Sequence, residues 1–353
     1  MCGNEAMAES AIQAGLDAYF GYPITLQNEV TAYMSKRMAE EGRAFVQSES
    51  ELAAVNMVFG ASATGKRAMT SSSSPGISLM QEGISYLAGA ELPCVIVNVM
   101  RGGPGLGNIA PSQGDYFQSV KGGGHGDYHC IVFGPSGVQE FADNTALAFD
   151  LADRYRIPVI ILADGIIGQM MEPVVIPTNS KLKTQNLKLP KKDWALTGSQ
   201  GRKQNIVRSL WLAEGAIEQH NYDLQAKYRQ IEKNETRCEQ YETDDADLIV
   251  VAYGISARIS RGAVDKARKQ GIKAGLIRPI TLWPFPSEQI SKAADEMLPG
   301  APGFLAVEMS CGQMVEDVRL AVSGKSSVAF WGRPGGGVPT VEQVFDKIKE
   351  LTV

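Results

Sequence analysis

The chain has 353 residues, which is enough for two domains of ordinary size. Hydrophobic residues make up 44% of it and charged residues 21%, as in an ordinary globular protein, and the formal net charge is -5. This acidic balance gives no electrostatic reason to expect binding to nucleic acid or to an anionic membrane surface.

The cysteines and the N-terminus bear on the cellular compartment. The five cysteines are widely spaced, none in a C-x-x-C pair, so we expect neither a zinc knuckle nor an iron–sulfur cluster on this chain and no disulfide framework. Residues 1–8 lack the basic start and apolar run of a signal peptide. Apolar runs such as residues 158–163 are too short to span a bilayer. We therefore expect a cytoplasmic protein.

The first half of the sequence alternates between short apolar runs and segments of helical length. Strands are predicted at residues 18–22, 44–47, 67–71, 93–100, 131–133 and 158–164, and helices at 4–16, 28–41, 51–62, 77–88 and 138–153. Strands that are apolar throughout are typical of a parallel sheet with helices on both faces. Residues 1–177 are therefore predicted to form a doubly wound α/β domain.

The pattern breaks over residues 178–244, which we interpret as a linker and helical crossover, with a polar helix within residues 205–234. It resumes with strands predicted at 246–253, 274–278, 304–309 and 328–331, and helices at 257–270, 287–296, 314–322 and 341–351. Residues 245–353 are thus predicted to form a second doubly wound α/β domain.

Two glycine-rich stretches come close to nucleotide-binding motifs without matching them. Residues 60–67 approach the phosphate-loop pattern, but Arg67 stands where a magnesium-binding hydroxyl is required, and a helix rather than a strand precedes them. The glycines after Arg101 lack the dinucleotide-binding spacing, and Pro104 removes an amide donor. A phosphate loop is therefore rejected, and a nicotinamide-dependent dehydrogenase is disfavoured.

Polar residues follow two of the predicted strands at their carboxyl ends, where open α/β sheets bind ligands. Tyr22, Pro23 and Thr25 follow the first strand, and Arg101 follows the strand at 93–100. Thr25 offers a hydroxyl donor, and the planar guanidinium of Arg101 suits bidentate capture of a carboxylate. Taken alone, each is explained equally well by a turn at a helix start or by a surface arginine.

Two carboxylates, Glu49 and Glu51, stand just before an apolar helix. One of them could simply satisfy the helix N-terminus and its dipole. A carboxyl group followed directly by Leu52 and small apolar residues is, however, expected to be partly buried, and a buried carboxyl group is suited to proton transfer.

His125 lies in a loop after three consecutive glycines, residues 122–124. Such a run makes a segment either mobile or closely packed against a ligand. The sequence does not decide between these alternatives for His125.

Taken together and in order, five segments resemble the large catalytic subunit of the 2-oxoacid:ferredoxin oxidoreductases. They are Gly-Tyr-Pro-Ile-Thr at residues 21–25, Gln-Ser-Glu-Ser-Glu at 47–51, Ser-Ser-Ser-Ser-Pro-Gly at 71–76, Arg101 with its glycine-rich loop, and Arg-Pro-Ile-Thr-Leu-Trp-Pro-Phe-Pro at 278–286. The resemblance covers essentially the whole chain. Residues 102–115 are most similar to the branch that acts on 2-oxoisovalerate, with 2-oxoglutarate or another 2-oxoacid as the alternative substrate.

The resemblance implies a fold and a division of labour between subunits. Residues 1–177 would be the pyrimidine-binding domain of a thiamine-diphosphate enzyme, and residues 245–353 a transketolase C-terminal-like domain. The sequence lacks the Gly-Asp-Gly motif that binds Mg²⁺ and diphosphate. The resemblance therefore places Mg²⁺ and the [4Fe-4S] clusters on partners: a diphosphate-binding subunit, a gamma-type subunit and a ferredoxin-like cluster subunit. The expected assembly is a dimer of hetero-oligomers that uses coenzyme A and passes electrons to ferredoxin.

The resemblance also assigns roles to individual residues, none of them as a metal ligand. Glu51 would be the catalytic acid and base at the pyrimidine ring of the cofactor. Thr25 and Arg101 would hold the keto and carboxylate groups of the substrate. Further cofactor contacts are expected from the following residues: Tyr22, Pro23, Ser73 and Ser74.

One departure from the family pattern is Leu26, which stands where a proline often follows Tyr-Pro-Ile-Thr. Two rival functions remain. A non-catalytic assembly subunit would be favoured by loss of Glu51 or Arg101, but both are present. A transketolase-like enzyme of one chain would need its own Gly-Asp-Gly motif, which the sequence lacks.

Overall fold

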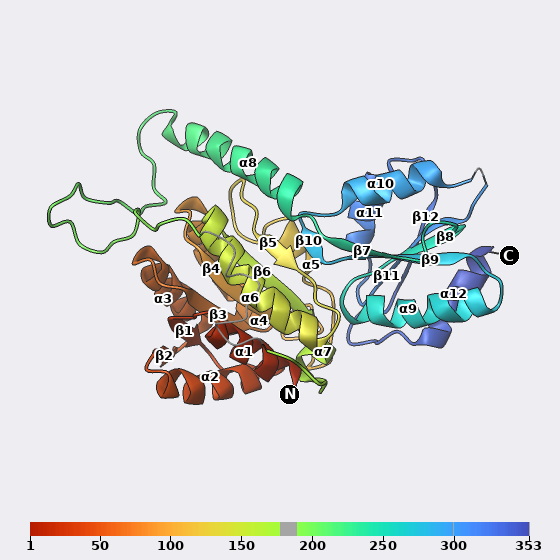
Figure 1. The fold of residues 1–353 in the computed structure, drawn as a ribbon, viewed down its shortest axis with the longest axis horizontal. Coiled ribbons are helices and arrows are strands. Elements are labelled where there is room, and N and C mark those ends of the chain that lie inside the picture. Colours follow the sequence, from red (N-terminus) through yellow and green to blue (C-terminus); the bar gives the residue numbers. More distant parts are fainter. Residues whose placement is uncertain (177–188, 299, 353) are drawn as a thin grey trace.

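A computed structural model describes residues 1–176, 189–298 and 300–352. Two β-sheets form the centres of two lobes that lie side by side (Figure 1). The first sheet has seven strands in the order β10-β5-β6-β4-β3-β1-β2, and the second has five in the order β12-β11-β8-β9-β7. Helices flank both sheets, which confirms the predicted α/β fold class.

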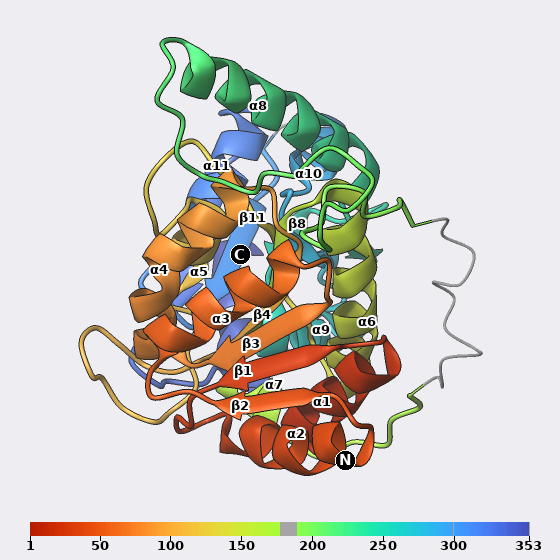
Figure 2. The same ribbon diagram turned by 90° about the vertical axis from the view of Figure 1, so that its left-hand side faces the viewer.

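In the first lobe, the strands that come from the N-terminal half all pair in parallel. They are β1 (Ala18–Gly21), β2 (Ala44–Gln47), β3 (Ala68–Ser72), β4 (Cys94–Met100), β5 (Ile131–Phe133) and β6 (Pro158–Asp164). The helices are α1 (Gly3–Gln13), α2 (Asn28–Glu40), α3 (Glu51–Ala63), α4 (Ser74–Gly89), α5 (Tyr116–Val120), α6 (Val138–Tyr155) and α7 (Gly165–Gln169). Helices α1, α2 and α6 cover one face of the sheet, and α3 and α4 cover the other (Figure 2).

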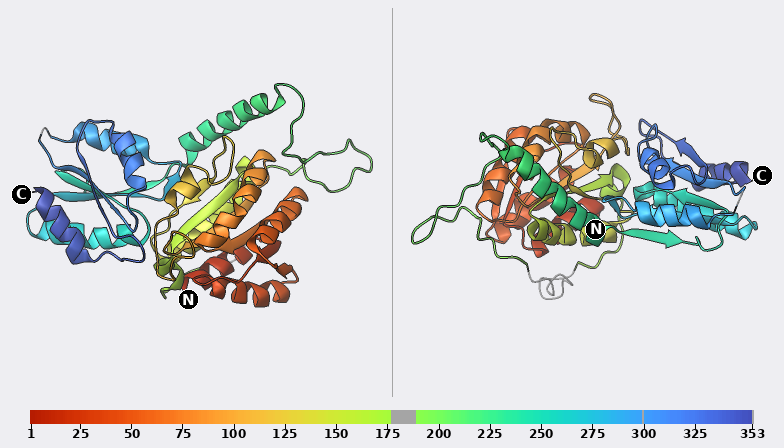
Figure 3. Two further views of the ribbon diagram at one scale, coloured as in Figure 1. Left: turned by 180° about the vertical axis from the view of Figure 1, so that it is seen from behind. Right: turned by 90° about the horizontal axis from the view of Figure 1, so that it is seen from above.

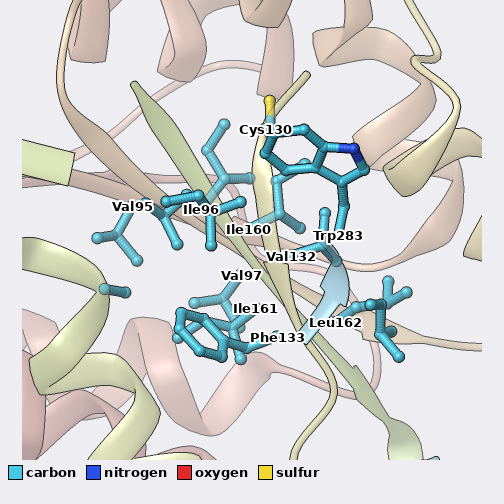
Figure 4. Close-up of a cluster of buried hydrophobic side chains, with 14 of the residues drawn as sticks. Val95, Ile96, Val97, Cys130, Val132, Phe133, Ile160, Ile161, Leu162 and Trp283 are labelled. Atoms are coloured by element: carbon cyan, nitrogen blue, oxygen red, sulfur yellow. The ribbon is translucent and has the colours of Figure 1, made fainter. Parts of the chain in front are cut away.

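The apolar runs became strands because the centre of the sheet is shielded on both faces. Every residue of β4 and β6 is buried, and the two strands pair in register from Cys94 opposite Pro158 to Met100 opposite Asp164. Figure 4 shows valine, isoleucine and leucine side chains of these strands packed with Phe133 of β5 and Trp283 of β10. Burial of each such side chain stabilises the fold by roughly 1.5–3 kcal/mol.

The second lobe repeats the same architecture on a smaller scale. Its strands are β7 (Cys238–Tyr241), β8 (Leu248–Val251), β9 (Ala274–Pro279), β11 (Gly303–Glu308) and β12 (Val328–Gly332). Helices α9 (Gly254–Lys269) and α12 (Val341–Thr352) pack on one face, and α10 (Ser287–Glu296) and α11 (Met314–Val322) on the other (Figure 1). Each sheet carries an antiparallel strand at one edge, β10 in the first and β7 in the second.

Two elements cross between the lobes. Strand β10 (Thr281–Trp283) follows β9 of the second sheet but pairs with β5 of the first. Helix α8 (Ala216–Glu235) lies along the first lobe (Figure 3) and buries Leu224, Tyr228 and Ile231 against it. The predicted polar helix is therefore shorter than expected, because residues 205–215 are not helical.

Buried polar groups join the lobes where the carboxyl ends of their strands face each other. The carboxylate of Asp164, at the end of β6, accepts hydrogen bonds from the Ile167 amide (3.1 Å) and from the Ile255 amide at the start of α9 (2.8 Å). Gln113 donates to the Tyr253 carbonyl (2.9 Å) and accepts from the Met309 amide (3.0 Å). Because unpaired polar groups are costly to bury, these bonds fix one arrangement of the lobes.

Candidate active site

Four neighbouring strands, β4, β3, β1 and β2, deliver the predicted site residues to one edge of the first sheet. Arg101 follows β4, Ser73 follows β3, Thr25 follows β1 and Glu51 follows β2. The strands are parallel, so their carboxyl ends meet at the same edge (Figure 2). The fold thus gathers residues that are up to 76 positions apart in sequence, the separation of Thr25 and Arg101 (101 less 25).

Glu51 is the first residue of α3, and its side chain is turned into the protein. The residue is only 4% exposed, and Oε1 accepts a hydrogen bond from the Ser72 hydroxyl at 3.1 Å. Glu49 is exposed. The N-terminus of α3 is capped by Ser50, whose hydroxyl accepts from the Ala53 amide at 3.2 Å. Because Ser50 serves as the N-cap, the buried position of the Glu51 carboxylate is not explained by a capping role.

Gly76, in the first turn of α4, closes tightly over this carboxylate. A Cβ atom at this position would lie 2.3 Å from Oε1 of Glu51 and 2.0 Å from Oγ of Ser72. Both distances are far inside van der Waals contact. The position next to the Glu51 carboxylate consequently has no room for a side chain.

Arg101 is 7% exposed and is held mainly through its backbone. Its amide donates to Oγ of Ser74 at 3.0 Å. In the guanidinium, Nη2 makes one long bond, 3.4 Å to the Leu106 carbonyl, while Nε is buried and has no hydrogen-bond partner among the described residues. No ion pair of Arg101 is found in that part of the chain either. An arginine with a buried donor that has no partner in this part of the chain is suited to receive an anion.

Asp115 is a candidate site residue that the sequence analysis missed. Its Oδ2 accepts from the Ser74 hydroxyl at 2.5 Å and from Nδ2 of Asn98 at 2.9 Å. Burial raises the pKa of the Asp115 carboxyl group, and the hydrogen bonds from Ser74 and Asn98 partly offset this effect. Only its place in the glycine-rich loop after Arg101 marked it in the sequence.

The turn that carries Thr25 is stabilised by hydrogen bonds of the Gln27 side chain. Nε2 of Gln27 donates to the Tyr22 carbonyl at 3.2 Å, and Oε1 of Gln27 accepts from the Ser71 hydroxyl at 2.6 Å. Tyr22, Pro23 and Thr25 are themselves exposed, and the Thr25 hydroxyl makes no hydrogen bond within the described chain. Its donor is available to a ligand.

Leu26, the departure from the family pattern, has an unusual backbone. Its φ angle is +87°, in the left-handed region, while the residue is only 5% exposed. Proline is confined to φ near −65°. The turn of this chain is therefore one that a proline at position 26 could not adopt.

The two serines after β3 differ in their partners. Ser73 is fully buried, and its Oγ has no hydrogen-bond partner among the described residues. Ser74 uses its hydroxyl within the chain, against Asp115 and the Arg101 backbone. Ser73 is thus the better candidate for a contact with a ligand.

His125 lies away from this edge. Its carbonyl accepts from the Ser85 hydroxyl, and its exposed ring contacts Tyr86 edge-on. Both partners lie in the second half of α4, whereas Gly76 is in the first turn. At 1.5 Å of rise per residue, Ser85 is about 14 Å further along the helix than Gly76. His125 is therefore not among the residues gathered at the strand ends.

Two further properties concern ions and membranes. Across residues 1–176, 189–298 and 300–352, no cluster of three or more His, Cys, Asp or Glu side chains could hold a metal ion. None of the helices in these ranges combines the length and the apolar character needed to cross a bilayer.

Family models match both lobes. Residues 9–242 match the thiamine-diphosphate-binding domain of pyruvate flavodoxin/ferredoxin oxidoreductase, and residues 246–344 match core domain II of pyruvate:ferredoxin oxidoreductase.

Curated relatives extend over the whole chain. The chain is 52% identical to the ketoisovalerate oxidoreductase subunit VorB of Methanothermobacter thermautotrophicus, over 99% of this chain and 96% of the relative. It is 35% identical to the 2-oxoglutarate synthase subunit KorA of the same organism, over 99% of this chain and 97% of the relative.

A solved structure shares the fold. It is the 2-oxoglutarate:ferredoxin oxidoreductase from Magnetococcus marinus with 2-oxoglutarate, coenzyme A and succinyl-CoA bound, with a TM-score of 0.82 and 26% identity over 99% of this chain. The present chain spans 64% of that longer chain. These matches over both lobes and the full length show that the chain belongs to the 2-oxoacid:ferredoxin oxidoreductase family, as one of its thiamine-diphosphate-binding subunits.

Proposed function

We propose that this chain is the pyrimidine-binding subunit of a complex that converts 2-oxoisovalerate and related branched-chain 2-oxoacids to acyl-CoA and CO2, with electrons passed to ferredoxin. The identity of 52% to relatives named for ketoisovalerate, against 35% to one named for 2-oxoglutarate, supports the branched-chain substrate. The observation that carries the proposal is the buried Glu51 carboxylate at the same sheet edge as Arg101, whose buried Nε has no hydrogen-bond partner in the described part of the chain.

The residues at this edge fit a thiamine ring. Glu51 offers a buried carboxyl oxygen for a ring nitrogen, and Ser73 offers a buried hydroxyl that has no hydrogen-bond partner among the described residues. Thiamine diphosphate, when bound, supplies the carbon nucleophile that attacks the keto group of a 2-oxoacid. Glu51 would hold and return a proton at the pyrimidine nitrogen. Tyr22 and Pro23 would line the site from the turn after β1.

Arg101 and Thr25 would orient the substrate. The free Nε and weakly bonded Nη2 of Arg101 can pair with the carboxylate that every 2-oxoacid carries. The Thr25 hydroxyl can donate to the keto oxygen. A non-catalytic assembly subunit would not need a buried carboxylate and an arginine with a free buried donor at the same sheet edge, so their presence favours catalysis.

The remaining machinery is assigned to partner subunits. We propose a diphosphate-binding subunit that carries Mg²⁺, a gamma-type subunit and a ferredoxin-like subunit with [4Fe-4S] clusters, assembled as a dimer of hetero-oligomers. The absent Gly-Asp-Gly motif supports this division. We place the complex in the cytoplasm, because all five cysteines are free thiols, as in a reducing compartment.

We further propose domain limits of 1–177 and 245–353, joined by residues 178–244. The two family matches, which meet between residues 242 and 246, support the second limit. The boundary at 177–178 lies outside the described residues. Strand β7 falls within the proposed linker but pairs with β9, so the linker ends as an edge strand of the second sheet.

The test is to purify the complex from its native source and to follow viologen-dye reduction with coenzyme A and a panel of 2-oxoacids. The proposal predicts a higher kcat/KM for 2-oxoisovalerate than for 2-oxoglutarate or pyruvate. It also predicts that the chain alone is colourless and inactive. Preference for 2-oxoglutarate would refute the substrate assignment, and turnover by the isolated chain would refute the division of labour.

A further inference from the structure

We propose that Asp115 and Gln313 are positioning residues for Arg101, so that the second lobe sets the geometry of the substrate carboxylate site in the first. The inference rests on the proposed role of Arg101. It is carried by a continuous series of hydrogen bonds that runs from the start of α11 to the end of β4.

The first step is the bond between Ser74 and Arg101. Ser74 Oγ lies 3.0 Å from the amide nitrogen of Arg101 and 3.2 Å from its carbonyl oxygen. It therefore lies within hydrogen-bond distance of both backbone polar groups of Arg101 at the point where β4 ends. The orientation of this hydroxyl decides how the arginine leaves the strand.

The second step is the orientation of that hydroxyl by Asp115. A serine has one hydroxyl hydrogen, and two acceptors compete for it here: Oδ2 of Asp115 at 2.5 Å and the Arg101 carbonyl at 3.2 Å. The shorter contact, to a carboxylate, takes the hydrogen. The lone pairs of Oγ are then turned to the Arg101 amide, which donates to them. Asn98 holds the same carboxylate oxygen from β4 at 2.9 Å.

The third step fixes Asp115 from the second lobe. The side-chain amide of Gln313 forms hydrogen bonds to the backbone on both sides of Asp115. Its Nε2 donates to the Gly114 carbonyl at 2.7 Å, and its Oε1 accepts from the Phe117 amide at 2.8 Å. The neighbouring Tyr116 hydroxyl donates to Asp317 of α11 at 2.7 Å. The segment that carries Asp115 is thus held by residues that belong to the other sheet.

Gln313 is itself held firmly. Glu308, at the end of β11, is fully buried and accepts from the backbone amides of Gln313 (3.0 Å), Met314 (3.0 Å) and Val315 (2.9 Å). A carboxylate at the N-terminus of α11 is favoured by the helix dipole. Because Glu308 anchors the backbone of Gln313, movement of the second lobe relative to the first would displace Asp115.

The test compares variants in the assembled complex by steady-state kinetics and by hydrogen exchange of the Arg101 amide. Asp115→Ala and Gln313→Ala should each raise KM for all 2-oxoacids by about 3- to 10-fold, the scale of the net contribution of one hydrogen bond. KM for coenzyme A should not change. Asp115→Asn keeps an acceptor oxygen for Ser74 and should restore most of the loss. In Asp115→Ala, the Arg101 amide should exchange faster.

The matched control is Gln139→Ala. Gln139, on the surface of α6, also forms two hydrogen bonds to the backbone through its side-chain amide. Its Nε2 donates to the Val175 carbonyl at 3.0 Å, and its Oε1 accepts from the Val175 amide at 2.8 Å. It should leave KM for 2-oxoacids unchanged. The double variant Arg101→Ala/Asp115→Ala should have the same KM as Arg101→Ala alone, since Asp115 acts through the arginine.

The outcomes separate the inference from the proposed function. If Arg101→Ala raises KM but Asp115→Ala and Gln313→Ala do not, the positioning inference is wrong and the role of Arg101 stands. If Arg101→Ala leaves KM unchanged, the proposed function of Arg101 fails first. Additive effects in the double variant would show that Asp115 acts independently of Arg101 and would overturn the inference.

Discussion

Replacement of Arg101 by alanine is expected to weaken binding of every 2-oxoacid, whatever its side chain, because all of them carry the same carboxylate. Within the described chain the guanidinium makes a single hydrogen bond, at 3.4 Å, and its Nε has no partner. Its removal should therefore cost the fold little. The lost charge-assisted pair with the substrate is worth about 1.5–3 kcal/mol, which corresponds to an increase in KM of about ten- to a hundredfold.

The assay is dye reduction by the assembled complex with 2-oxoisovalerate, pyruvate and 2-oxoglutarate. KM should rise by a similar factor for all three, and Arg101→Lys should recover only part of the loss, because an ammonium group cannot form the planar pair. Arg258→Ala serves as the control, since Arg258 is a half-exposed arginine paired with Glu172. If Arg101→Ala weakens only coenzyme A binding and leaves 2-oxoacid turnover intact, the assignment of Arg101 to the substrate carboxylate is wrong.

Three further predictions concern the fold around the site. In Gly76→Ala, the added methyl group should clash with the Glu51 carboxylate, which should destabilise the chain by about 1–3 kcal/mol in urea denaturation and lower turnover. Gly60→Ala is the control, because this helix position has open space, and it should show no such loss of stability. Leu26→Pro should destabilise the chain by more than about 1 kcal/mol in the same assay, because proline cannot adopt φ +87°; an unchanged unfolding midpoint would contradict this. Burial raises the pKa of Asp164 to about 6. Because the folded state then holds a proton that the unfolded state has lost, the free energy of unfolding should fall by about 2 kcal/mol as the pH rises from about 4 to about 6. Asp164→Asn should abolish this slope in denaturation at several pH values, and an equal slope in both proteins would contradict it.

Hydrophobic pattern predicted the strands whose burial is complete. β4 and β6 are apolar at almost every position and lie at the centre of the sheet, so their sequences alone marked them. β7 and β10 were not predicted. β7 is a polar edge strand, Cys-Glu-Gln-Tyr, and β10 has only three residues and is followed directly by Pro284, so neither carries a periodic signal. Pairing with another strand, rather than local pattern, makes them strands.

Some residues of the candidate site were likewise predicted from the sequence, and others were not. Residues 22–25 and Arg101 stood out because they follow strands, and Glu51 because it precedes an apolar helix; the parallel sheet brings their segments to one edge. The resemblance assigned the role to Glu51 rather than Glu49, and the structure adds support, because it buries the first and exposes the second. Asp115 and Gln313 could not be identified as a pair of positioning residues from the sequence, because their hydrogen-bond partners are far away along the chain. Asp115 bonds to Ser74, 41 residues away, and Gln313 bonds to Phe117, 196 residues away.

The central claim is that Glu51 performs proton transfer at the pyrimidine ring of the cofactor. Its most direct test is hydrogen–deuterium exchange at the C2 carbon of thiamine diphosphate bound to the assembled complex, in wild type, Glu51→Gln and Glu49→Gln. Glu51→Gln keeps a hydrogen-bonding oxygen but cannot carry the proton, so the cofactor should remain bound while exchange slows by about 10²–10⁴-fold. Glu49→Gln, at an exposed position, should exchange like wild type. Exchange at the wild-type rate in Glu51→Gln, or a large loss in Glu49→Gln instead, would contradict the account.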